Sequence, residues 1–164
     1  MNIVLCGMMG SGKTTVAAEF GKLGYKVIDT DAQIVERYGS IDKIFSEHGE
    51  EYFRDVETQV VKEVMQNYDS AVISLGGGCV LRQENVKNLK AGGKIFYLRA
   101  KAETLIKRLK GDTTRPLLKG GLEERVRSIL AVRSGIYEGV ADFIIDTDEL
   151  SPAEIAMKIR DKNL

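Results

Sequence analysis

Short apolar runs alternate with longer amphipathic segments along the whole of this 164-residue chain. The short runs are rich in valine and isoleucine, and they lie at residues 2–6, 26–29, 71–75, 94–98 and 143–146. Their near-continuous apolar character is typical of strands that are buried on both faces of a sheet. The alternation therefore predicts an α/β fold, in which helices cover both faces of a five-stranded parallel sheet.

The segments between these runs have the periodicity of helices. They are residues 13–23, 50–67, 101–110 and 122–137. A last helix begins near residue 152, because Ser151 is suited to an N-cap, Pro152 to the first turn and Glu154 to a capping box. Since no repeat or linker interrupts the pattern, we expect one domain over residues 1–164.

Two segments do not fit the simple alternation. Residues 30–49 carry only short helical pieces, and residues 111–121 form a polar, glycine-bounded loop. Segments of this length in a compact domain are commonly lids or binding loops. We therefore expect both to be moving parts.

The composition excludes several classes of protein. Basic and acidic residues number 24 each, which argues against a nucleic-acid-binding or membrane-surface protein. No apolar run reaches the roughly 20 residues that span a bilayer, and the amino terminus lacks a secretion signal. Cys6 and Cys79 have apolar neighbours and no metal-ligand spacing, so we expect buried, reduced thiols in a cytoplasmic protein. With a single histidine, His48, a histidine-rich metal site is excluded.

The strongest motif follows the first short run. Residues 7–14 read Gly-Met-Met-Gly-Ser-Gly-Lys-Thr and match the P-loop pattern G-x-x-x-x-G-K-[ST] between a strand and a helix. In that pattern, backbone N–H groups wrap a phosphate at the positive end of the helix. Lys13 would reach the β- and γ-phosphates, and the hydroxyl of Thr14 would ligate Mg²⁺. A ligand-free glycine turn is the weaker alternative, so the sequence predicts binding of a nucleoside triphosphate.

Two carboxylates follow the second strand, where Asp29 and Asp31 flank Thr30. Residues two apart on an extended chain project to the same side, at the strand end where ligands bind in such folds. If this strand neighbours the first, one carboxylate would hold magnesium while the other accepts a proton from an attacking hydroxyl. A helix N-cap with a solvated turn is the alternative.

Glycines and arginines complete the candidate residues. The third strand ends in Gly76, Gly77 and Gly78, which would allow close approach of a ligand or make a wide turn into a helix. Arg54, Arg115 and Arg133 stand out by position. The planar guanidinium suits carboxylates and phosphates, and Arg115 lies in the glycine-bounded loop expected to move. The alternative for each arginine is a role in surface solubility.

Taken in order, these motifs resemble those of the shikimate kinase family. The resemblance runs from residue 1 to about residue 152, through residues 7–15, 29–31, 53–54 with Glu57, 76–78, 115–117 and Arg133 with Tyr137. It implies a three-layer, P-loop nucleotide kinase-like fold, with a substrate-binding insert at about 30–60 and a lid at about 111–121. It also implies transfer of the ATP γ-phosphate to the 3-hydroxyl of shikimate, in the pathway to chorismate and aromatic amino acids.

The resemblance assigns a role to individual residues. Asp31 matches the proposed catalytic base, and Asp29 matches the residue associated with Mg²⁺ through water. Arg54 and Arg133 match the pair that grips the substrate carboxylate, and the glycine run (Gly76, Gly77 and Gly78) contacts the substrate, with Gly77 donating a backbone N–H.

On the ATP side, the family implies Gly10, Ser11, Gly12, Lys13, Thr14 and Thr15 as the phosphate loop. Arg115 matches the lid arginine that closes over the phosphates, so Lys13, Arg115 and Asp31 form the implied catalytic set. Arg108 falls where the family often places an arginine against adenine. Residues 147–151 are acidic, although many members carry a basic residue there.

Two other functions stay open at this point. A gluconate or nucleoside monophosphate kinase would share the architecture, although the arginines and glycines do not suggest the apolar slot that a nucleobase needs. An ATP-dependent switch without phosphoryl transfer would leave Asp31, Arg54 and Arg133 unexplained. For partners we expect ATP and a small-molecule acceptor, with no nucleic acid or membrane, and a monomer is our default.

Overall fold

The computed structural model describes residues 1–111 and 121–163, and its centre is one parallel sheet of five strands. The strands are β1 (Asn2–Cys6), β2 (Val27–Asp29), β3 (Val72–Ser74), β4 (Gly93–Arg99) and β5 (Phe143–Asp146). Their order is β2-β3-β1-β4-β5, and every neighbouring pair is parallel. The predicted α/β fold is confirmed, and each strand begins and ends within one residue of its expected position.

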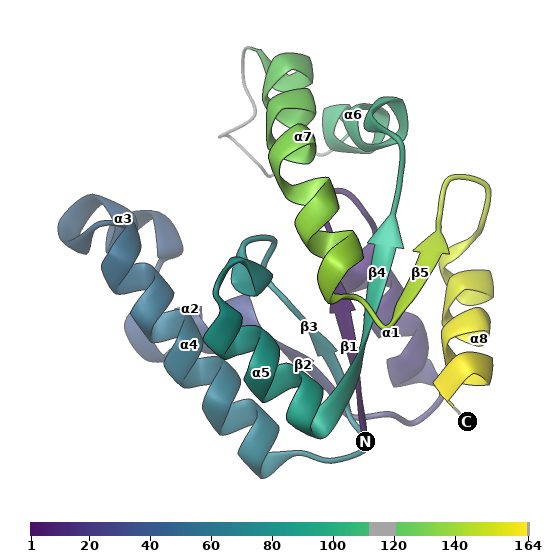
Figure 1. The fold of residues 1–164 in the computed structure, drawn as a ribbon, viewed down its shortest axis with the longest axis horizontal. Helices are drawn as coiled ribbons and strands as arrows, with labels where there is room; N and C mark the ends of the chain where they lie inside the picture. Colours follow the sequence, from purple (N-terminus) through teal and green to yellow (C-terminus); the bar gives the residue numbers. More distant parts are fainter. Residues whose placement is uncertain (112–120, 164) are drawn as a thin grey trace.

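Helices cover both faces of this sheet in the described part of the chain (Figure 1). They are α1 (Lys13–Lys22), α2 (Thr30–Tyr38), α3 (Ile41–His48), α4 (Glu50–Asn67), α5 (Gln83–Gly92), α6 (Ala102–Lys110), α7 (Leu122–Val140) and α8 (Pro152–Asn163), with a short 3₁₀ turn η1 (Cys79–Leu81). The pair α1 and α8 lies on one face, and α4, α5 and α7 lie on the other. Helix α5 has no counterpart among the predicted helices, and α7 extends three residues beyond its predicted end at residue 137.

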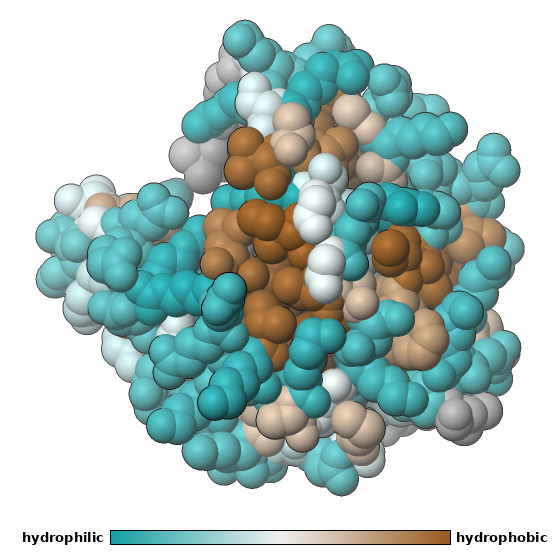
Figure 2. All heavy atoms as spheres, in the orientation of Figure 1, coloured by the Kyte–Doolittle hydropathy of each residue, from teal (hydrophilic) through white to brown (hydrophobic). Residues whose placement is uncertain are grey.

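The core is divided by the sheet into two apolar clusters, because successive strand residues point to opposite faces. Ile3 and Leu5 of β1 pack in the cluster with α1 and α8, whereas Val4 and Cys6 pack in the cluster with α4, α5 and α7. Figure 2 shows that apolar surface on the latter face gathers where α5 and α7 approach one another, and that the surrounding helices present mostly hydrophilic side chains. This three-layer packing fixes the carboxyl ends of the strands along one edge.

One expectation about the strands is wrong, and one condition that the sequence left open is not met. β5 is an edge strand, so it is not buried on both faces, and Ile144 is 38% exposed. β2 does not neighbour β1, because β3 lies between them. The carboxylates that follow β2 therefore reach the loop after β1 only across the end of β3.

Several local predictions are confirmed. The capping box of α8 is present, since Ser151 Oγ accepts from the Glu154 N–H at 3.2 Å and Glu154 Oε1 accepts from the Ser151 N–H at 3.3 Å. Cys6 and Cys79 are buried free thiols. Residues 30–49 form the two short helices α2 and α3. Apart from these predictions, the described residues 1–111 and 121–163 contain no helix that combines the length and the apolar character needed to span a membrane.

Candidate active site

The loop between β1 and α1 needs glycine at specific positions. Gly7, Gly10 and Gly12 have φ values of 147°, 80° and 97°, in the left-handed region that other residues rarely adopt. A Cβ on Gly7 would lie 2.8 Å from the carbonyl oxygen of Leu98, so a side chain there would collide with β4. The glycine pattern therefore sets the path of the loop, as the P-loop interpretation requires.

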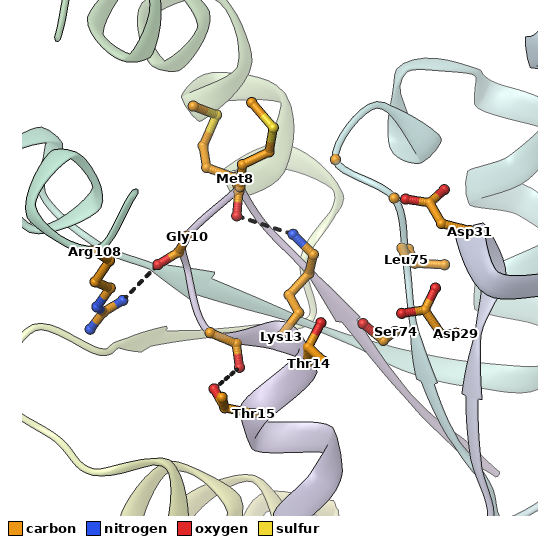
Figure 3. A pocket seen from close by; sticks show the side chains of 14 residues that line it. Met8, Gly10, Lys13, Thr14, Thr15, Asp29, Asp31, Ser74, Leu75 and Arg108 are labelled. Carbon is orange, nitrogen blue, oxygen red and sulfur yellow. Dashed lines mark hydrogen bonds between the residues drawn. The ribbon is translucent and has the colours of Figure 1, made fainter. Parts of the chain in front are cut away.

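A positive charge lies at the centre of this loop. Lys13 Nζ donates to the Gly7 carbonyl oxygen at 2.6 Å. It also donates to the Met8 carbonyl oxygen at 3.1 Å, the bond drawn in Figure 3. The first turn of α1 contains no acidic residue, so the partial positive charge of the helix end is not neutralised locally. Ser11 is buried in the loop, and its hydroxyl has no hydrogen-bond partner among the described residues. The loop is a ready site for an anion.

A cavity of about 420 Å³ opens beside the loop. Several residues singled out in the sequence line it: Gly10, Gly12, Lys13, Thr14, Thr15, Asp29, Asp31, Gly76, Gly77 and Arg108. Figure 3 shows Lys13 in the middle of this set, with Arg108 on one side and the two aspartates on the other. The structure therefore places the phosphate loop and both carboxylates around one space, even though β3 separates their strands.

The two carboxylates reach the cavity from the start of α2. Asp29 is the N-cap of this helix, and its carboxylate accepts from the Ala32 N–H at 3.0 Å. Asp31 already lies in the first helical turn, so the expectation that both project from an extended chain is wrong. The N-cap alternative is correct for Asp29, but the same residue also lines the cavity. Capping and a role in the site are not exclusive here.

Each glycine after β3 faces one of the side chains that the sequence analysis assigned to substrate binding. A Cβ on Gly76 would lie 2.6 Å from Asp31 Oδ1, and one on Gly77 would lie 3.3 Å from Arg133 Nη1. A Cβ on Gly78 would lie only 2.5 Å from Arg54 Nη2. The run makes a turn into η1, as the alternative interpretation expected, and the same turn is a surface against which three charged groups lie.

The same geometry places Arg54, Arg133 and Gly78 beside the cavity instead of on its wall. Arg54 Nη1 donates to Glu57 Oε1 at 2.9 Å, from one turn to the next of α4. Glu57 is 1% exposed, and its other oxygen has no partner among the described residues. Burial raises the pKa of Glu57, and the neighbouring guanidinium opposes that rise. Arg54 is thus held in place by a buried carboxylate.

Two residues near the glycine run had no role from sequence reasoning. Glu57 and Tyr137 were only positions in the family's motifs, although the spacing of three residues between Arg54 and Glu57 is the helical signal for such a pair. Tyr137 of α7 is fully buried, and its hydroxyl donates to the Gly77 carbonyl oxygen at 2.6 Å. No local sequence signal indicates that contact, because the two residues lie 60 positions apart.

On the opposite side of the cavity, Arg108 joins two segments. It donates to the Gly10 carbonyl oxygen at 3.1 Å and to the Thr147 carbonyl oxygen at 3.3 Å. Beside it, a second cavity of about 700 Å³ is lined by Thr104, Lys107, Arg108, Gly111 and Asp148. This cavity leaves room for a nucleobase next to the phosphate loop. Arg115 and most of the predicted lid lie outside the described residues.

The acidic segment after β5 has a structural role. The carboxylate of Asp148 accepts from the Lys101 N–H at 2.9 Å and from the Thr104 hydroxyl at 2.6 Å. It therefore caps the amino end of α6 from another part of the chain, and Lys101 itself supplies no side-chain cap. Asp148, one of the acidic residues that depart from the family pattern, thus anchors the start of α6.

Comparisons with known proteins agree on one family. The family model described as "SKI: Shikimate kinase" matches residues 9–163. Over 162 residues the chain is 49% identical to a shikimate kinase of Caldicellulosiruptor bescii, covering 96% of this chain and 92% of that protein. It is 47% identical to a shikimate kinase of Thermodesulfovibrio yellowstonii, with the same two coverages. A solved shikimate kinase of Acinetobacter baumannii, in complex with shikimate, is 35% identical with a TM-score of 0.89, and the match covers 98% and 91% of the two chains.

Proposed function

The chain belongs to the shikimate kinase family, and from this premise we propose how the site described above carries out ATP-dependent phosphorylation of shikimate. The reaction transfers the γ-phosphate of ATP to the 3-hydroxyl of shikimate and gives shikimate 3-phosphate and ADP. ATP is the co-substrate. The roles of individual residues given below are proposals.

The phosphates of ATP bind at the loop between β1 and α1. Backbone N–H groups of residues 10–15 surround them, and the positive end of α1 favours their charge. Lys13, which donates to the Gly7 and Met8 carbonyls in this structure, turns its ammonium toward the β- and γ-phosphates. Arg108 lies beside the adenine of ATP. Arg115 of the lid adds positive charge next to the γ-phosphoryl group that is transferred.

The oxygens of Thr14 and Asp29 fit a Mg²⁺ site. Both residues line the cavity beside the phosphate loop, and a hydroxyl with a carboxylate is a donor set of the kind that this hard cation prefers. Mg²⁺ in protein sites keeps several waters and needs only one or two protein ligands. When bound, Mg²⁺ neutralises charge on the phosphate oxygens.

Shikimate binds between the glycine run and the two arginines. Arg54 and Arg133 pair with its carboxylate, and the backbone of residues 76–78 lies against the ring. Asp31 accepts the proton of the attacking hydroxyl, because its carboxylate lies beside Gly76 on the cavity wall. Catalysis then depends on position and charge, as phosphoryl transfer requires.

The observation that carries this assignment is the correspondence between three glycines and three charged groups. A Cβ added to any of these three glycines would lie within 3.3 Å of a side-chain atom of Asp31, Arg133 or Arg54. An ATP-dependent switch without an acceptor gives no reason for two guanidiniums and a carboxylate to close on one backbone segment, whereas an acceptor with one carboxylate and several hydroxyls does. Gluconate carries the same groups as shikimate, and it is the family match that favours shikimate over gluconate.

We further infer the domain organisation, the cellular location and the oligomeric state of the protein. Residues 1–164 form a single kinase domain, with residues of about 30–60 as the substrate-binding insert and about 111–121 as the lid. The enzyme works in the cytoplasm as a monomer. Size-exclusion chromatography with light scattering tests the last point, and a dimer mass would contradict it.

The test of function is a coupled ADP-release assay with Mg-ATP. Reactions contain no acceptor, shikimate, quinate, gluconate or one of a panel of nucleoside monophosphates. Strong stimulation by shikimate alone is the expected result. Stimulation by gluconate or a nucleotide would overturn the acceptor assignment, and acceptor-independent hydrolysis would favour an ATP-dependent switch.

A further inference from the structure

The glycine run, Gly76–Gly78, is a segment of intrinsically flexible backbone beside the candidate site. Three consecutive glycines lose more conformational freedom on folding than any other residues, and their peptide groups turn easily. Within residues 1–111 and 121–163, the N–H groups of Gly77 and Gly78 donate to no acceptor. A backbone that must present such donors to a ligand in one direction requires anchors outside the run.

One anchor holds the start of the run. The hydroxyl of Thr30 accepts from the Gly76 N–H at 3.3 Å and donates to the Ser74 carbonyl oxygen at 3.4 Å. The Gly76 carbonyl oxygen accepts from the Cys79 N–H at 3.1 Å. These contacts fix the peptide groups on either side of Gly76 but not the peptide group between Gly77 and Gly78.

The second anchor is Tyr137, and it acts on that remaining peptide group. Its hydroxyl donates to the Gly77 carbonyl oxygen at 2.6 Å, which is short and therefore strong for a neutral hydrogen bond. The peptide bond is trans, so the Gly78 N–H points opposite to that carbonyl. Holding the carbonyl toward α7 consequently fixes the direction of the Gly78 N–H and limits rotation at Gly77.

Tyr137 is itself rigid. It is fully buried, and its ring packs against Tyr97 with the centroids 5.0 Å apart. Burial raises the pKa of Tyr137, and the Arg133 guanidinium, which hydrogen-bonds the same hydroxyl, opposes that rise. A tyrosine hydroxyl carries its proton at neutral pH in either case, so it remains a donor. The residue also lies one helical turn after Arg133, so a single helix face sets both the guanidinium beside Gly77 and the hydroxyl that holds it.

We propose that Tyr137 is a positioning residue for shikimate binding. Its hydroxyl holds the peptide group between Gly77 and Gly78, which fixes the Gly78 N–H and limits rotation at Gly77, so that the run keeps one orientation toward the acceptor. This inference rests on the proposed function and adds to it a residue that does not touch the substrate. It predicts that loss of the buried Tyr137 hydroxyl, which does not line the cavity, lowers the affinity for shikimate and leaves the affinity for ATP unchanged.

The experiment compares Tyr137→Phe with Tyr97→Phe. Both variants lose one tyrosine hydroxyl from the same pair of rings, but the Tyr97 hydroxyl makes no hydrogen bond among the described residues, and Tyr97 lines a different cavity from that of the candidate site. KM for shikimate, KM for ATP and kcat are measured by ADP release, and shikimate affinity is measured separately by titration calorimetry. Thermal unfolding of each variant reports its stability.

Tyr137→Phe is expected to raise KM for shikimate and its calorimetric Kd by about tenfold, which corresponds to one lost hydrogen bond. Its KM for ATP should change by less than about twofold, and Tyr97→Phe should match the wild type in all constants. Equal changes in the two KM values, or an unchanged shikimate affinity, would overturn the proposal and leave Tyr137 with a structural role only.

Two controls keep the outcomes distinct. If the wild type shows no shikimate-dependent activity, the proposed function fails, whereas an active wild type with an unaffected Tyr137→Phe refutes only this inference. If Tyr137→Phe folds poorly, the comparison is repeated in a Gly139→Ala background. That substitution adds a helix-favouring residue to α7 at a position where a Cβ meets no atom within 4 Å.

Discussion

A methyl group added at Gly78 gives the sharpest test of the acceptor site. Gly78 has φ −97° and ψ 3°, a conformation open to alanine, so Gly78→Ala introduces no left-handed backbone strain. The new carbon would stand 2.5 Å from Arg54 Nη2, whereas an ordinary contact is about 3.5 Å. The guanidinium must therefore retreat by about 1 Å.

That retreat has a cost that can be estimated. Arg54 is held by its 2.9 Å hydrogen bond to Glu57, so it cannot move without weakening the pair. A misplacement of about 1 Å in a positioned group can lower a rate about 10²-fold, which corresponds to about 2.7 kcal/mol of transition-state stabilisation. We expect kcat/KM for shikimate to fall by about this factor, with KM for ATP nearly unchanged.

The assay is ADP release over a shikimate titration at saturating ATP, and then over an ATP titration at saturating shikimate. Gly139→Ala is the matched control, because a Cβ there meets no atom within 4 Å. It should retain wild-type constants. A Gly78→Ala enzyme with shikimate kinetics within twofold of the wild type would refute the placement of Arg54 against the glycine run.

Four further substitutions test other contacts. Asp31→Asn is expected to lose most turnover while its calorimetric affinity for ATP stays near that of the wild type, because an amide cannot take the hydroxyl proton; normal turnover would remove Asp31 from the mechanism. Arg133→Ala should raise KM for shikimate far more than KM for ATP, and the reverse pattern would place this guanidinium on the nucleotide. Asp148→Ala should lower the free energy of unfolding in denaturant titrations by about 1 kcal/mol through loss of the α6 cap, and an equal value would show that the cap contributes nothing. Burial raises the pKa of Glu57, so its contribution to stability is present at low pH and is lost as pH rises above the ordinary range of a carboxyl group; the wild type should therefore lose stability relative to Glu57→Gln as pH rises, and parallel profiles would contradict this.

Most secondary structure could be predicted because it depends on local patterns. The strands are short apolar runs, α4 has a long regular stripe, and the capping box at Ser151 is a local signal. The helix α5 was not predicted because its only buried residues are Asn85 and Leu89, which are too few to give a periodic apolar pattern. α7 continues past Tyr137 although Gly139 follows, since packing overrides a weak helix former.

The candidate site could be predicted only in part. The phosphate loop is a contiguous motif with fixed spacing, so its residues follow from the sequence. The order of the strands is set by long-range pairing, and that is why β3 between β1 and β2 was not foreseen. Contacts such as Tyr137 with Gly77 join segments 60 residues apart and leave no trace in either segment.

The central place of β1 in the sheet leaves two strands on each side of the phosphate loop. On one side, β3 and β2 carry the glycine run and Asp31; on the other, β4 and β5 lead to the segments that hold Arg108 and Asp148. The proposed acceptor site draws on both sides, because Arg133 and Tyr137 lie on α7, between β4 and β5, and both reach Gly77. The acceptor site is therefore assembled only when both sides of the sheet pack against β1, whereas the phosphate loop is one contiguous segment.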